Sequence, residues 1–280
     1  MATAIAIVWG AHMGHTRLGN IPTGKKWKAV VAALASSADD TVSFGILSED
    51  VELVALRTLE AAKTGLNRAL DDEGLKYTFF VLTQIALASR EPDWRKRLSR
   101  IGIDVPAETS PFALSAELHK SIDDYLLTRG FSTDISEIAQ QAAGEAVTSL
   151  TAEEARTLFG TGEKELQSAV RRLSTSRGFA DLGQRFFGRF MARFLNFYLS
   201  RATAAQVGGN RFQSTSDISK FNTILERHCE QTARIVRDFC GEWYSKTEYR
   251  EGIDLENTSR FMAVAVKKLQ SELERQRKNL

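Results

Sequence analysis

The distribution of proline constrains the fold of this chain more than any other sequence feature. The 280 residues contain four prolines, and Pro111 is the last of them. Because proline inside a helix removes a hydrogen bond and clashes with the preceding turn, its absence from the rest of the chain favours long, uninterrupted helices. The best strand candidate, Thr41–Leu47, cannot form a sheet alone. We therefore predict an all-α protein built as a multi-helix bundle.

The most unusual stretch runs from Arg171 to Arg211. It contains eight arginines and one acidic residue, Asp181, together with seven aromatic residues. As one helix over residues 181–205, it aligns a cationic and an aromatic stripe side by side at helical spacing. The cationic stripe consists of Arg185, Arg189 and Arg193. The aromatic stripe consists of Phe187, Phe190, Phe194 and Phe197.

Two interpretations of these stripes follow from the sequence. In the first, a central helix buries the aromatic stripe and directs its arginines at acidic neighbours, since aromatic stripes usually pack in cores. In the second, the helix is a nucleic-acid surface on which four arginines contact phosphates. These nucleic-acid-binding candidates are Arg185, Arg189, Arg193 and Arg201.

Charge is segregated along the chain, which bears on both interpretations. Residues 104–165 contain twelve acidic and four basic side chains, whereas the stretch after them is strongly basic. Such segregation predicts either pairing between an acidic and a basic part of the same molecule, or separate surfaces for separate partners.

Local signals divide the chain and place several helix ends. The segment from Gly102 to Ser110 contains Pro106 and is the clearest linker. Ser110 precedes a proline and is predicted to start a helix that Gly130 ends. A capping box that begins at Thr151 predicts the start of another helix. We predict an N-terminal arm over residues 1–24, a helical subdomain over 25–105 and a second one over 106–280.

The hexapeptide Gly241–Lys246, with the sequence GEWYSK, is predicted to lie at the end of a helix that runs from about residue 217 to 243. Trp243 and Tyr244 offer large amphipathic surfaces and Lys246 offers a positive charge, so these three residues are candidates for binding a partner. The alternative is structural. In that case Trp243 completes the core and Lys246 caps helix carbonyls.

A search for catalytic groups gives one weak enzyme candidate. The carboxylates of Asp238, Glu242 and Glu248 lie near Lys246 and have the composition of a metal-dependent nuclease site, although such sites normally occupy strands. His228 and Cys229 are adjacent, so on a helix they point about 100° apart and cannot form a dyad directly. We predict no catalytic residue, no metal and no cofactor.

The cysteines and histidines also point away from a disulfide or metal centre. Cys229 and Cys240 would lie about 16 Å apart along a helix, which is too far for a disulfide, so reduced core thiols and a cytoplasmic location are expected. His12 and His15 have no third ligand nearby. No run of eighteen apolar residues is present, so we predict no membrane span.

Several motifs together resemble a known group of sequences. They are MGHTRLG from Met13 to Gly19, the Lys25-Lys26-Trp27 segment, FCGEWYSK at residues 239–246, and the aromatic and basic residues from Phe187 to Arg201. This combination is similar to a set of uncharacterised bacterial proteins. The resemblance implies a subunit that works beside an ATPase or a nuclease in phage-defence or mobile-element gene clusters, and it transfers no catalytic residue. Residues 1–12 depart from the pattern, and we hypothesise that Met13 is the native start.

The sequence thus predicts a non-enzymatic helical interaction subunit of a bacterial complex. Its expected partner is a protein, an ATPase or nuclease subunit, with nucleic acid as a further partner through the basic aromatic helix. Two alternatives stay open. One is a nuclease or other enzyme with a site near residues 238–248, and the other is a purely structural protein–protein adaptor.

Overall fold

The computed structural model describes residues 19–35, 48–106, 109–130, 132–154, 163–209 and 212–278. Over these residues the protein consists of ten helices, and its only strand-like feature is an isolated bridge between Val207 and Phe212. The predicted all-α multi-helix bundle is confirmed. The strand candidate at residues 41–47, the two N-terminal histidines, Arg211 and the hypothetical start at Met13 lie outside the described residues.

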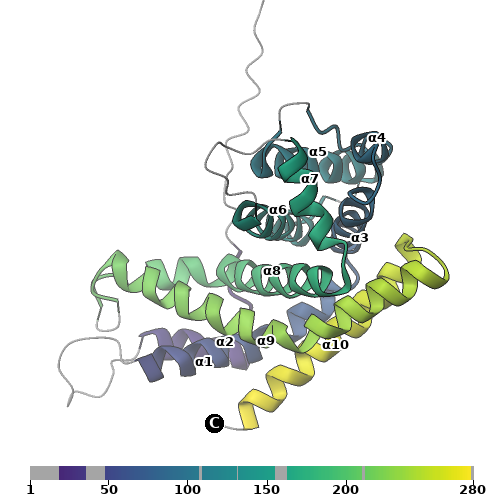
Figure 1. Cartoon of the computed structure of the whole chain (residues 1–280). Helices are drawn as coiled ribbons and strands as arrows, with labels where there is room; N and C mark the ends of the chain where they lie inside the picture. The colour runs from purple at the N-terminus through teal and green to yellow at the C-terminus, as the bar shows by residue number, and fades with distance from the viewer. Residues whose placement is uncertain are drawn as a thin grey trace, which may run out of the picture.

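The helices follow one another along the chain as labelled in Figure 1. They are α1 (Lys25–Ala35), α2 (Ser48–Ala69), α3 (Glu73–Ala88), α4 (Trp94–Ser99), α5 (Pro111–Arg129), α6 (Asp134–Glu154), α7 (Glu163–Leu173), α8 (Ser176–Ala204), α9 (Thr215–Arg250) and α10 (Leu255–Lys278). None of them, within the described part of the chain, is long and apolar enough to cross a bilayer.

Helix α8 is the central element of the bundle. It lies between the group formed by α3 to α7 and the pair α1 and α2, and it packs along α9 (Figure 1). Its first turn is set by Thr175, whose side chain accepts a hydrogen bond from the backbone N–H of Gly178 at 3.0 Å. The prediction of one long helix through this basic aromatic stretch is therefore confirmed.

The aromatic side chains of α8 form the middle of the core. Phe187, Phe190 and Phe194 are at most 2% exposed, whereas Phe197 is half-buried. Phe187 contacts α3, which is buried on nearly all sides. The ring of Phe79 on α3 lies 5.5 Å from that of Phe187, measured between centroids. The structure thus buries the aromatic stripe, as the first interpretation predicts.

Helices α8 and α9 approach closely because glycine occupies the points of contact. A Cβ atom at Gly241 would lie 2.4 Å from the carbonyl oxygen of Ser176, and one at Gly183 would lie 2.5 Å from Sγ of Cys240. Cys229 and Cys240 are both buried, free thiols, as predicted. The two helices are thus packed almost backbone to backbone along this seam.

Two predicted helix ends are wrong. Thr151 does not start a helix, since its hydroxyl donates to the carbonyl of Val147 at 2.7 Å inside an uninterrupted α6. A threonine inside a helix can donate its hydroxyl to a carbonyl of the preceding turn. From the sequence alone, such a threonine cannot be distinguished from one that caps the start of a helix. The hexapeptide Gly241–Lys246 is also not terminal, because α9 continues to Arg250. Its glycine serves the contact with α8 rather than a helix stop.

The predicted linker at residues 102–110 separates helices that still share a core. Helices α2 and α3, before the linker, pack against α6, α9 and α10, which follow it. Buried residues from both sides belong to one continuous hydrophobic cluster. The division into two subdomains at residue 105 stays a prediction.

Candidate functional site

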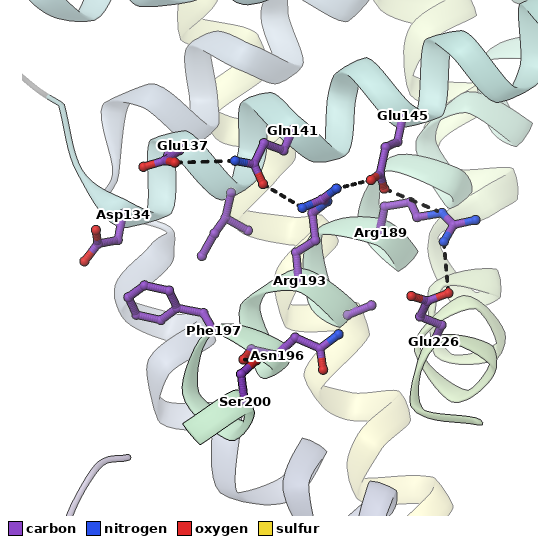
Figure 2. A pocket seen from close by; sticks show the side chains of 12 residues that line it. Asp134, Glu137, Gln141, Glu145, Arg189, Arg193, Asn196, Phe197, Ser200 and Glu226 are labelled. Atoms are coloured by element: carbon purple, nitrogen blue, oxygen red, sulfur yellow. Dashed lines mark hydrogen bonds and ion pairs between the residues drawn. The ribbon is translucent and has the colours of Figure 1, made fainter. Parts of the chain in front are cut away.

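A cleft of about 280 Å³ opens between α6 and α8, with α9 at one end (Figure 2). Each helix contributes polar side chains from one side. Helix α6 supplies Asp134, Glu137, Gln141 and Glu145; α8 supplies Arg189, Arg193, Asn196 and Ser200; α9 supplies Glu226. The acidic residues of α6 recur at helical spacing and therefore line up along the side that faces α8.

Arg193 lies at the centre of the cleft. Its Nη1 donates to Oε1 of Gln141 at 2.6 Å, and its Nη2 forms an ion pair with Glu145. The amide of Gln141 in turn donates to Glu137 at 3.4 Å. Because the Arg193 side chain is only 35% exposed, these contacts lie in a partly desolvated place, where they are stronger than on an open surface.

Arg189 connects the cleft to α9. Its Nη1 donates to Oε2 of Glu226 at 3.2 Å, its Nη2 lies 3.8 Å from Glu230, and its Nε lies 3.9 Å from Glu145. Arg185 also donates to Glu230, at 3.1 Å. Glu145 and Glu230 are each shared between two arginines, so the contacts form a continuous network across α6, α8 and α9. Figure 2 shows the part of this network that runs from Gln141 through Glu145 to Glu226.

The lining of the cleft has an excess of negative charge. Four carboxylates, from Asp134, Glu137, Glu145 and Glu226, face two guanidinium groups. Both guanidiniums lie toward Glu145 and Glu226, whereas Asp134 and Glu137 lie at the opposite end, beside the ring of Phe197 (Figure 2). Two of the four carboxylates thus lie at one end of the cleft.

The structure brings three of the four predicted nucleic-acid-binding arginines together, and it surrounds them with carboxylates. Arg185, Arg189 and Arg193 contact glutamates of α6 and α9, as the first interpretation expects. Arg201 lies apart from them, and its Nη1 donates to Oδ1 of Asn20 at 2.7 Å. A phosphate at the first three positions has to compete with carboxylates already in place. Nucleic-acid contact by these four arginines stays a prediction.

The predicted partner-binding residues do not share one surface. Tyr244 is fully buried and stacks on Phe179 with 4.1 Å between ring centroids. Trp243 is half-buried and stacks on Phe261 at 4.2 Å. Lys246 is exposed and pairs with Glu242 at 2.9 Å along α9, rather than capping a helix end. Two of the three side chains therefore pack in or against the core, and only that of the lysine is exposed.

The carboxylates of the predicted enzyme candidate each contact a different cation. Asp238 pairs with Arg237 at 3.0 Å, while Glu248 lies 3.5 Å from Arg90. Among the residues that the structure describes, no group of three or more His, Cys, Asp or Glu side chains is arranged to hold a metal ion. Burial raises the pKa of the Cys229 thiol, which disfavours a reactive thiolate.

Sequence reasoning missed the acidic half of the site. The signal was available, because Asp134, Glu137 and Glu145 recur at helical spacing inside the net-negative segment 104–165. What the sequence alone could not provide is the side of α6 that meets α8.

Comparisons of the chain with protein-family models, with curated proteins and with solved structures found no match.

Proposed function

We propose that this chain is a non-enzymatic helical interaction protein whose α6–α8 cleft binds a cationic group of a protein partner. The observation that carries the proposal is the surplus of carboxylates in a partly buried cleft. Opposite charges that meet in such a place attract more strongly than on an open surface, and they select the partner by charge.

The end of the cleft beside Asp134 and Glu137 is the part best suited to a lysine or arginine side chain. Two carboxylates supply negative charge there, and Phe197 adds an aromatic face that a cation can approach. Glu137 also accepts a hydrogen bond from Gln141, and Glu145 and Glu226 pair with Arg193 and Arg189, so an incoming cation would join an existing polar network. A basic peptide segment is therefore the ligand class that complements the lining.

The sequence resemblance would make the partner an ATPase or nuclease subunit of a bacterial, anti-phage complex. No contact in the structure bears on that identity, so it stays a prediction. The alternative of a purely structural adaptor shares the same cleft and differs only in what the complex does. The nuclease alternative has less support, because the carboxylates near residues 238–248 pair with separate cations.

Calorimetric titration with short peptides tests the proposal. Hexalysine is expected to bind the wild-type protein and hexaglutamate is not, with affinity falling as salt increases. The double change Asp134→Asn and Glu137→Gln should remove most of this binding. A control with the same loss of charge is Asp238→Asn with Glu256→Gln, at exposed positions on α9 and α10. Equal effects of both variants would refute the assignment to the cleft.

The same material tests the sequence-based alternative for this face. If short DNA or RNA binds the wild-type protein, and Arg189→Glu abolishes binding while the protein still melts normally, the arginines serve nucleic acid. If Arg189→Glu lowers the stability of the protein and leaves nucleic-acid binding unchanged, the arginines of α8 stabilise the fold through their ion pairs with the glutamates.

A further inference from the structure

Three arginines of the basic stretch lie outside the network with the glutamates of the cleft. Arg171 and Arg172 occupy the last turn of α7, and Arg177 occupies the first turn of α8. All three side chains are exposed. The helices are joined by only Ser174 and Thr175, so the three arginines gather at one corner of the molecule.

Hydrogen bonds hold this corner in a fixed shape. The carbonyl of Arg171 accepts bonds from the N–H and hydroxyl of Ser174, at 3.0 and 2.6 Å. The carbonyl of Arg172 accepts bonds from the N–H and hydroxyl of Thr175, at 3.2 and 2.8 Å. Arg90, which follows α3, also donates to the carbonyl of Ser174.

A glycine brings the two helix ends into contact. A Cβ atom at Gly178 would lie 2.0 Å from the carbonyl oxygen of Arg172, so the first turn of α8 rests directly on the last turn of α7. Arg177 precedes this glycine. The backbone atoms that carry Arg172 and Arg177 are therefore held close together by the packing of the two helix ends.

The position of Arg177 has no evident benefit for folding. Cations in the last turn of a helix are favoured by the helix dipole, which accounts for Arg171 and Arg172. Arg177 lies in the first turn of α8, where the dipole disfavours a cation and where no acidic residue offsets it. The carboxylate one turn further on, Asp181, bonds to Arg237 at 2.8 Å instead.

We propose that the α7–α8 corner binds the phosphate backbone of nucleic acid. Arginine suits this role because its planar guanidinium can donate two hydrogen bonds to one phosphate. The cationic character continues along α7, where Lys164, Ser168 and Arg172 line a surface groove of about 290 Å³ together with Glu165. Two helices thus present a polar, predominantly basic edge.

The surroundings of the corner favour nucleic acid over a protein or a bilayer. No large apolar side chain is exposed among the described side chains of residues 164–178. Protein interfaces usually contain aromatic or aliphatic anchors, and interfacial membrane binding needs buried apolar area. Phosphate contacts need only cations and hydroxyl groups, and Thr175 and Ser176 are exposed beside the arginines.

Fluorescence anisotropy with a labelled 20-base-pair duplex and a single strand of the same length tests the proposal. The wild-type protein is expected to bind at 50 mM salt, with an affinity that falls steeply with added salt. The triple variant Arg171→Ala, Arg172→Ala and Arg177→Ala should bind more weakly. Its slope of log affinity against log salt should be smaller by about 2.7 for the duplex, at about 0.9 per lost phosphate contact.

A second triple variant controls for net charge. Arg227→Ala, Arg234→Ala and Arg260→Ala removes the same charge from exposed positions on α9 and α10, and it should leave the slope nearly unchanged. Two results would overturn the proposal. One is no binding by the wild-type protein at low salt, including the case in which it binds anionic vesicles or acidic peptides instead. The other is an equal loss in both triple variants. Hexalysine binding at the α6–α8 cleft should survive the first triple variant, which separates this proposal from the previous one.

Discussion

The replacement Gly241→Ala probes the close packing of α8 and α9 most directly. The added methyl would lie 2.4 Å from the carbonyl oxygen of Ser176 and 3.0 Å from Cβ of Ala180. Ordinary contact begins near 3.4 Å, so the backbones have to separate by about 1 Å at this point. A backbone carbonyl inside a helix cannot move aside alone, and the two helices must shift as bodies.

Two opposing effects set the magnitude. Overpacking of a tight contact costs about 1–3 kcal/mol, and alanine inside a helix is favoured over glycine by about 1 kcal/mol. The same shift also disturbs the stacking of Tyr244 on Phe179, next along α9. We therefore expect the upper part of the range and a net loss of about 2 kcal/mol. For a chain of 280 residues the melting temperature should fall by about 3–4 °C.

Urea unfolding followed by circular dichroism measures this loss. Ser245→Ala, at an exposed position one turn further along α9, is a control that gains helix propensity without a new contact. Its free energy of unfolding should be equal to or slightly higher than that of the wild type. If Gly241→Ala behaves like this control, α8 and α9 do not approach as closely as described, and the argument fails.

Three further predictions concern the hexapeptide, a histidine and the thiols. Trp243→Ala should lower the free energy of unfolding by about 3 kcal/mol because it removes a ring from the core. Lys246→Ala should leave the midpoint of urea unfolding unchanged. Similar losses of stability in both variants would contradict these assignments. Burial lowers the pKa of His119, so its neutral form is favoured in the folded protein, and stability should be complete above about pH 6.5 and fall as the pH decreases from there. His119→Gln should flatten this dependence below about pH 6.5, and an unchanged profile would show that other groups cause it. Cys229 and Cys240 should react with a thiol reagent only in urea, since burial raises both pKa values; rapid labelling of the native protein would show that the α8–α9 seam opens readily.

The sequence was most informative where the signal is local. Ser110 accepts a hydrogen bond from the backbone N–H of Ala113 at 3.1 Å, and Gly130 ends α5 in a left-handed conformation with φ of 71°. Both residues act within one helical turn, so their types alone predict the boundaries. Gly241 was misassigned as part of a helix end because its role depends on Ser176, a residue of another helix. A glycine that stops a helix and one that admits a neighbouring backbone look the same in a sequence.

The candidate site was predictable only in part for the same reason. The spacing of Arg189 and Arg193 predicts a common side of α8, and the segregated charge predicts acidic partners. Which carboxylates meet them depends on how α6 and α9 pack, and periodicity carries no information about that. Arg201 has the same spacing along α8, yet its bonding partner, Asn20, comes from the segment before α1.

The sharing of Glu145 between two arginines has a consequence for how this protein can change over evolutionary time. Loss of this carboxylate alone leaves the partly buried cations of Arg189 and Arg193 without their common counterion. Replacement of either arginine alone is milder, because Glu145 keeps the other. Substitutions in this part of the protein are therefore expected to occur in a preferred order, with an arginine changing before the glutamate, and divergent descendants should exchange the three positions as a linked set.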